Sequence, residues 1–419
     1  MANKTQASKL AGKLTLLLVL AMIGLGLGGC KKPPFTPDGP GTIKPATRGT
    51  IRVLLTKTPT GSASLAGSIG VRIVADGKVV RPGRPISSIR RSGNAWIIGN
   101  RSVRANRLTV ETTGTQSNKH VGFNSKTYHG KLILTPRGPN AFIVVNHVNL
   151  DDYLAGVLAK ELFGSWHVEA YRGLAVAART FAYYNMIHSS SARDYDLQDG
   201  VKSQVYGGIM GETLKSRRAV NSTRGWVLTA RYRGKDRIFM PQYSSCCGGH
   251  VNAAIVLRDA PPIKPLQGGQ ADQHCTASNK YRWAPVRISK SALFGLLCGN
   301  HSQVRSLGGL RTIKVTQQLA HGRPVWVNLI GVNGKTMRLR AEKIRLAMIF
   351  SNIPRYKKLY SMNCQIVDTG SGFEFRNGRG YGHGVGMCQY GLQGKALAGW
   401  KAEQIIEFYY PGAKVVKLY

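Results

Sequence analysis

The chain has 419 residues, enough for two or more domains with substantial hydrophobic cores, so a single small module is excluded. Lysine and arginine outnumber aspartate and glutamate 59 to 19, which gives a formal net charge of +40. This excess is spread along the chain rather than gathered in one tail. It favours a polyanionic partner, for which nucleic acid, anionic lipid head groups and acidic wall polymers are the candidates.

The first thirty residues predict where the protein works. Three lysines precede an apolar run at residues 14–27, which is too short for a comfortable membrane span and ends in Gly28-Gly29-Cys30. The pattern resembles a bacterial lipoprotein signal, in which the cysteine is lipidated; an ordinary cleaved signal and an uncleaved anchor are the alternatives. We expect a lipid anchor at Cys30 outside the cytoplasm, and therefore no nucleic-acid partner.

Residues 31–48 are rich in proline, glycine and threonine and predict a flexible tether. Short runs with period-two alternation follow and predict a β-rich region over residues 49–130, with similar strands continuing to residue 145. Asp76-Gly77 is typical of a hairpin turn. We expect this region to be a structural or glycan-contacting platform. The clearest runs are residues 51–55, 71–80, 95–99, 107–112, 130–135 and 141–146.

Residues 150–188 predict two helices joined at a short bend. Asp151 and Asp152 suit the first turn of one helix, and apolar residues then recur at helical spacing. Gly164-Ser165 interrupts the pattern, and we expect Ser165 to cap the second helix, with Glu169 in its first turn. Small and apolar residues along this second helix predict a narrow face suited to close packing.

Glu161 stands out at the end of the first of these helices. Its neighbours in sequence include Leu158, Leu162, Phe163 and Trp166. A carboxyl in such surroundings loses hydration, so its pKa should rise toward that of a general acid. The alternative is an ordinary surface glutamate at a helix terminus.

A polar loop follows over residues 189–208. Its carboxylate, amide and phenol groups suit hydrogen bonding to a sugar or orientation of a catalytic group, although solvated loop polarity is the alternative. The residues concerned are Asp194, Asp196, Asp199, Gln204 and Tyr206.

The remainder predicts a mixed α/β domain. We expect a helix at residues 213–222, a strand pair at 226–230 and 237–243, and a strand-rich insertion at about 300–365. Five glycines then alternate around His383, a density that permits close backbone approach or unusual turns. Helices at 389–398 and 402–408 complete the pattern. The fold class is therefore α+β, a β-rich N-terminal region followed by a mixed α/β domain.

Several chemistries are excluded or disfavoured. The chain has no phosphate-binding loop, no dinucleotide fingerprint and no His-Glu-x-x-His helix. A serine or cysteine nucleophile lacks its local signature around residues 244–250. A zinc site is conceivable, but adjacent cysteines rarely bind one metal together and the usual ligand spacing is missing. The residues conceivable for zinc are Cys246, Cys247, His250, His274 and Cys275.

Four stretches in a fixed order carry a family resemblance. They are residues 146–184, residues 203–208, residues 243–250 with Asp272, Cys275 and Trp283, and residues 378–412. Together they resemble the stage II sporulation protein D and amidase-enhancer family over roughly residues 125–415. The resemblance implies a catalytic domain spanning 131–419 that acts on peptidoglycan as a lytic transglycosylase.

The resemblance also implies roles for particular residues. Glu161 occupies the position of the catalytic glutamate, and the supporting or substrate-binding residues would be Arg179, Gln204, Tyr206, Ser244, His383 and Gln389. Some members bind zinc through cysteines, but Leu197 and Ser203 stand at those places here, so no metal or other cofactor is expected. Cys388 replaces the usual serine.

Three further expectations complete this interpretation. Apart from Cys30, six cysteines allow 15 disulfide pairings, of which we prefer Cys247 with Cys275. The partners would be glycan strands and a cell-wall amidase. One alternative is a non-catalytic wall binder that enhances an amidase, and the other is a secreted basic protein that binds an unrelated polyanion.

Overall fold

The computed structural model describes residues 41–42, 49–56, 58–65, 70–81, 87–113, 120–200 and 203–419. The chain is an α+β protein with 29% helix and 35% strand, which confirms the predicted fold class. Cys30 and the apolar run before it lie outside the described residues. Among the described residues, none of the helices combines the length and the hydropathy of a membrane span.

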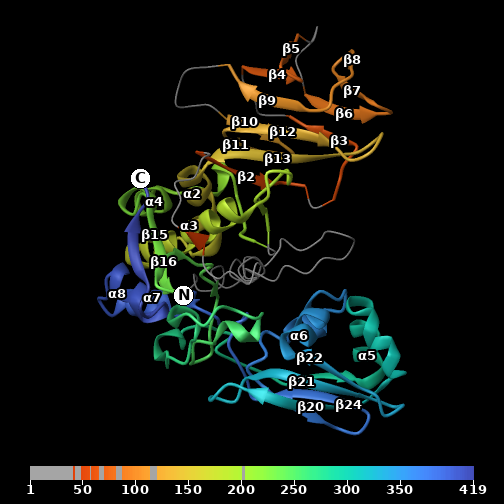
Figure 1. Ribbon diagram of the computed structural model, residues 1–419, viewed down its shortest axis with the longest axis vertical. Helices are drawn as coiled ribbons and strands as arrows, with labels where there is room; N and C mark the ends of the chain where they lie inside the picture. Colours follow the sequence, from red (N-terminus) through yellow and green to blue (C-terminus); the bar gives the residue numbers. More distant parts are fainter. Residues whose placement is uncertain are drawn as a thin grey trace, which may run out of the picture.

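The β-rich region is built on a seven-stranded sheet (Figure 1). Its neighbouring strands are antiparallel except for β14 and β2, which are parallel. Asp76 and Gly77 turn the predicted hairpin with positive φ angles of 44° and 87°, as a tight two-residue turn requires. In order across the sheet, the strands are β14 (Leu197–Gln198), β2 (Thr50–Leu54), β13 (Phe142–Asn149), β12 (Lys131–Pro136), β9 (Leu108–Thr112), β4 (Val71–Ala75) and β5 (Lys78–Val80).

A four-stranded sheet and a two-stranded ribbon share the hydrophobic core of this region. Trp96 is fully buried, and its ring meets that of Phe142 edge-on at 5.1 Å between centroids. The ring contact therefore joins the two sheets into one core. The strands of the smaller sheet are β3 (Ser62–Ser64), β6 (Ser88–Ser92), β7 (Ala95–Ile98) and β8 (Arg101–Val103), and the ribbon is β10 (His120–Phe123) with β11 (Lys126–His129).

The two predicted helices are α2 (Leu150–Glu161) and α3 (Val168–His188), and they follow β13 directly. Most of α3 is buried, and it packs against α2, α4 (Leu214–Ser222), α7 (Gln389–Leu397), α8 (Ala402–Tyr409) and β15 (Trp226–Tyr232). A Cβ at Gly173 would lie 3.0 Å from Leu392, so the predicted narrow face does permit close packing. The predicted Ser165 cap is wrong, because His167 Nδ1 accepts the Glu169 amide instead.

A sheet of strands β1 (Gly41–Thr42), β16 (Lys235–Ile238), β15 (Trp226–Tyr232) and β27 (Lys414–Lys417) lies beside α3. The pairing of β1 with β16 gives the predicted tether one ordered contact. The predicted strand 237–243 is wrong in its length. Pro241 cannot donate a hydrogen bond to a strand ladder, and the chain re-enters a sheet only at β17 (Tyr243–Ser244).

The insertion has its own hydrophobic core, separate from that of the rest of the chain. Figure 1 shows this part beside the helical region, with α5 and α6 next to its sheets. Sequence reasoning found β20, β21 and α6 but passed over α5 and the second sheet. The elements are β19 (Val286–Ser289), α5 (Lys290–Asn300), β20 (Leu310–Gln318), β21 (Pro324–Gly331), β22 (Thr336–Arg340), α6 (Ala341–Ile349), β23 (Gln365–Asp368) and β24 (Gly372–Arg376).

Candidate functional site

Glu161 is the last residue of α2, and only 5% of it is exposed. Gln389 Nε2 donates to its Oε2 at 3.0 Å and to its backbone carbonyl at 3.1 Å. The Val205 amide donates to Oε1 at the longer distance of 3.4 Å. Three segments far apart in the sequence therefore meet at this one carboxyl.

Burial sets the protonation of Glu161. Loss of hydration raises its pKa from 4.5 to about 7, and the hydrogen bonds from Val205 and Gln389 oppose only part of that rise. The carboxyl is thus about half protonated near neutral pH, a state in which such a group can both give and take a proton. The alternative of an ordinary surface glutamate is wrong.

The pKa of Glu161 predicts how stability should change with pH. Below pH 4.5 the carboxyl is protonated in both the folded and the unfolded chain, so it imposes no penalty. As the pH rises toward 7, the unfolded chain releases the proton while the folded chain retains it, so the free energy of unfolding falls and then levels off. The total loss should be about 3 kcal/mol relative to Glu161→Gln, measured by urea unfolding from pH 4 to 8. Parallel pH profiles for the two proteins would contradict the raised pKa.

Gln389 reaches Glu161 because of how α7 begins. Strand β26 (Met387–Cys388) immediately precedes the helix and pairs in parallel with β17. One turn further along α7, Gln393 Oε1 accepts the His167 amide at 2.8 Å. The two glutamines thus fix the α2–α3 bend, and Lys215 holds it from the other side by donating to the carbonyls of Gly164 and Trp166.

Gln204 and Tyr206 flank the segment that contacts Glu161, but both are fully buried. Gln204 Nε2 donates to the Tyr243 hydroxyl at 2.9 Å, and its Oε1 accepts from the Tyr153 hydroxyl at 3.1 Å. The Tyr206 hydroxyl donates to Asn146. These bonds hold Val205 against the carboxyl, so Gln204 and Tyr206 support the site from beneath.

Three aromatic side chains form a cluster next in sequence to Glu161 and Gln389, with Trp166 buried between the other two. Trp166 lies 5.3 Å from Phe163 and 5.2 Å from Tyr390 between ring centroids, and both of these partners are half-buried. Such faces suit contact with the apolar faces of sugar rings. Sequence reasoning did not single out Tyr390, although its place directly after Gln389 was the available signal.

Ser244 and His383 shape the glycine-rich loop. The Ser244 hydroxyl accepts the Gly384 amide at 3.0 Å, and His383 Nδ1 accepts the Val385 amide at 3.0 Å. Gly384 has a φ of 66°, and a Cβ there would lie 2.1 Å from Asn252. Ser244 and His383 are 3% and 1% exposed, so these contacts position the β17–β26 pair rather than offer an open binding surface.

Arg179 does not join this group, and the predicted cleft role is wrong. Its side chain is fully buried, and its guanidinium donates to Asp151 and to the carbonyls of Val220, Thr223 and Trp226. Asp151 lies in the first turn of α2 and Glu161 at its end, about 15 Å away along the helix axis. Arg179 therefore ties α2 to α4 and β15.

The carboxylates of the polar loop form ion pairs and hydrogen bonds with other parts of the protein. Asp196 pairs with Arg52 at 2.7 Å and is 4% exposed, while Asp194 pairs with Arg137. Asp199 accepts the Tyr206 amide at 2.9 Å and so orders the segment that carries Val205. These acids support the structure around the site.

The expected disulfide is not formed in the structure. Cys247 and Cys275 are free, with their sulfur atoms 3.6 Å apart, whereas a disulfide requires about 2.0 Å. The two thiols share a buried space with Cys388 and Asp272, so each has other neighbours.

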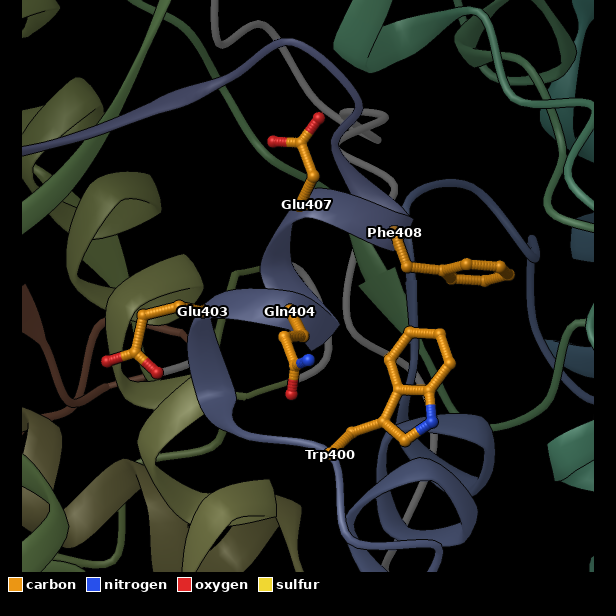
Figure 2. A pocket seen from close by; sticks show the side chains of 5 residues that line it. All are labelled: Trp400, Glu403, Gln404, Glu407 and Phe408. Atoms are coloured by element: carbon orange, nitrogen blue, oxygen red, sulfur yellow. The ribbon is translucent and has the colours of Figure 1, made fainter.

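A shallow pocket lies elsewhere, on α8. Figure 2 shows its lining side chains Trp400, Glu403, Gln404, Glu407 and Phe408. None of the predicted site residues lines this pocket. It plays no part in the candidate site at Glu161.

Comparisons with known proteins agree with the resemblance. The family described as Stage II sporulation protein matches residues 139–230, which contain Glu161, Gln204 and Tyr206. An uncharacterised protein of Brachyspira hyodysenteriae is 30% identical over 79% of this chain and 84% of its own length. Stage II sporulation protein D of Bacillus subtilis is 27% identical over 73% of this chain and 86% of its own. The amidase enhancer of Bacillus subtilis is 28% identical over 62% of this chain, but over only 39% of its own length.

Proposed function

Because the chain belongs to the stage II sporulation protein D and amidase-enhancer family, we propose that it cleaves the glycan strands of peptidoglycan by lytic transglycosylation. Glu161 would serve as both acid and base. The observation that carries this proposal is a buried glutamate at the family's catalytic position with a pKa of about 7.

The proposed reaction needs one carboxyl group. Glu161 protonates the oxygen that bridges muramic acid and glucosamine, and the bond from that oxygen to C1 of the muramic acid breaks. The resulting carboxylate takes the proton from the C6 hydroxyl of the same sugar, whose oxygen bonds to C1 and leaves a 1,6-anhydro end. Ordinary glycosidases use a pair of carboxylates at the scissile bond. The groups that hydrogen-bond to the Glu161 carboxyl are the Val205 and Gln389 amides, so the proposed reaction assigns both proton transfers to Glu161.

The two hydrogen bonds give the oxygens of Glu161 different roles. Gln389 Nε2 holds Oε2 as an acceptor, so the proton resides on Oε1, where the Val205 contact is long. The bond from Gln389 becomes stronger once the carboxylate forms, because hydrogen bonds to an ionised acceptor are stronger. Gln389 thereby stabilises Glu161 after proton donation. Phe163 and Tyr390 would hold the adjacent sugar rings.

The product identifies the reaction. The full chain should be incubated with purified glycan strands, both peptide-bearing and denuded, and the products analysed by mass spectrometry. Transglycosylation predicts fragments ending in 1,6-anhydromuramic acid, which are lighter by one water than hydrolysis products. We expect faster release from denuded strands. Reducing ends without the anhydro bridge would instead identify a hydrolase.

One relative favours a second candidate, a wall-binding protein that enhances a cell-wall amidase. It rests on the similarity to the Bacillus subtilis amidase enhancer. This function predicts glycan binding without anhydro products, together with faster release of stem peptides when an amidase is added. In both cases the protein would work in the cell envelope, attached through lipid at Cys30.

The net charge of +40 predicts salt-dependent glycan binding. A glycan strand bears a lactyl carboxylate on every second sugar unless peptides mask it, and salt screens attraction to such charges. We expect affinity for denuded strands to fall about tenfold between ~0.05 and ~0.5 M salt, measured by sedimentation of insoluble glycan. Glu161→Gln should show the same dependence. Binding that does not respond to salt would remove this role for the charge.

A further inference from the structure

Four potential metal ligands meet in a buried cluster beneath the start of α7. They are Cys247, Asp272, Cys275 and Cys388, and their ligand atoms all lie within 4.8 Å of one another. Cys247 follows β17, and Cys388 ends β26. Asp272 caps a short 3-10 helix (Gln273–Cys275) that Cys275 ends. The chain thus brings three separate segments to one point.

Two of the distances between these atoms match the edges of a metal tetrahedron. Zinc binds cysteine sulfur at about 2.3 Å and carboxylate oxygen at about 2.1 Å, which places two sulfurs about 3.8 Å apart and a sulfur and an oxygen about 3.6 Å apart. Cys247 Sγ lies 3.6 Å from Cys275 Sγ and 3.6 Å from Asp272 Oδ2. An ion could enter with little rearrangement of these side chains.

The surroundings of Cys388 suit a thiolate. Its sulfur accepts the Cys247 amide at 3.2 Å and the Gly391 amide at 3.3 Å. It is also the N-cap of α7, where the helix dipole favours negative charge. Backbone donors directed at a sulfur support it as a metal ligand.

Asp272 is held in place by groups outside the cluster. Lys395 Nζ donates to Oδ1 at 2.8 Å, and the Tyr409 hydroxyl donates to Oδ2 at 2.7 Å. Both Asp272 and Lys395 are buried. Three thiolates and one carboxylate around a divalent ion would leave a net negative charge, and the positive charge of Lys395 offsets part of it.

We propose that Cys247, Cys275, Cys388 and Asp272 bind one zinc ion as a closed structural site. Four protein ligands in tetrahedral geometry leave no open position for a substrate, so the ion would serve the fold. Cys388 precedes Gln389, the residue that contacts Glu161, so the ion would fix the start of α7 against β17. This departs from the expectation of a protein without metal, and it extends beyond the proposed glycan cleavage.

Metal content tests the site independently of activity. The full chain should be produced with zinc, dialysed and analysed by elemental mass spectrometry alongside Cys275→Ser and Cys388→Ser. We expect one zinc per chain in the wild type and at least a tenfold lower content in both variants. The matched control is Cys298→Ser on α5, in the other hydrophobic core, which should retain one zinc.

Cobalt and thiol chemistry complete the test. Replacement of zinc by Co²⁺ should produce thiolate-to-metal charge-transfer bands in the wild type and the Cys298→Ser control, and not in Cys388→Ser. The proposal is overturned if the wild type contains no stoichiometric metal, or if mass spectrometry of the unreduced protein shows Cys247 and Cys275 joined as a disulfide.

Discussion

Replacing Glu161 with glutamine should lower the rate of 1,6-anhydro end release by about 10²- to 10⁴-fold, the usual contribution of a positioned acid or base. Glutamine has nearly the same shape, and its carbonyl can still accept from Gln389 Nε2, which now bonds Oε2 at 3.0 Å. It cannot deliver a proton to the bridging oxygen. Glycan affinity should stay within about twofold, because the net charge and the bordering aromatic side chains are almost unchanged.

The matched control for this substitution is Glu403→Gln on α8. Glu403 is exposed and pairs with Arg172 at the surface, so its loss should leave both rate and affinity unchanged. If Glu161→Gln retained more than a tenth of the wild-type rate, Glu161 would not be the proton donor. If neither protein released anhydro ends while both bound glycan, the amidase-enhancing function would be preferred.

Replacing Arg179 with methionine should cost about 3 to 5 kcal/mol of unfolding free energy. The substitution removes the guanidinium donor from the carbonyls of Val220, Thr223 and Trp226. It also removes the nearest cation from Asp151, which keeps only the Tyr419 hydroxyl and the more distant, exposed Arg224. Urea unfolding monitored by tryptophan fluorescence measures this loss. Arg179, on α3, contacts the start of α2, whereas Glu161 lies at the end of that helix. The activity per folded molecule should therefore change by less than about twofold.

Arg172→Met on the same helix is the control for Arg179. Arg172 keeps 23% of its side chain exposed and pairs with the mostly buried Glu169 and the exposed Glu403, so its loss should cost less than that of the fully buried Arg179. A stable Arg179→Met protein with strongly reduced activity would show instead that Arg179 acts on the substrate. That result would restore the role first expected from the family resemblance.

Local patterns in the sequence were sufficient for much of the fold. Apolar spacing predicted α2 and α3, and alternation predicted six of the seven strands of the large sheet, because these elements bury one face each. The remaining strand, β14, lies in the segment that was predicted as a polar loop. The same reasoning placed Glu161 at a helix end among apolar neighbours, from which its raised pKa followed. The predicted strand at 237–243 was wrong in its length because Pro241, which cannot donate a hydrogen bond to a strand ladder, follows β16.

Long-range contacts set the rest, and local patterns do not specify them. The bond between Gln389 and Glu161 joins residues 228 positions apart, and only the family resemblance brought the two together. Arg179 shows the limit of that resemblance, since a motif places a residue on a helix without giving the direction of its side chain. The cluster around Cys388 likewise depends on the pairing of β17 with β26.

A direct titration of Glu161 tests the central claim that burial keeps this carboxyl protonated near neutral pH. The full chain can be labelled with ¹³C at glutamate carboxyls, and the Glu161 resonance assigned by its absence from Glu161→Gln. We predict that its chemical shift titrates with a midpoint near pH 7. A midpoint near 4.5, the ordinary value for glutamate, would contradict the account.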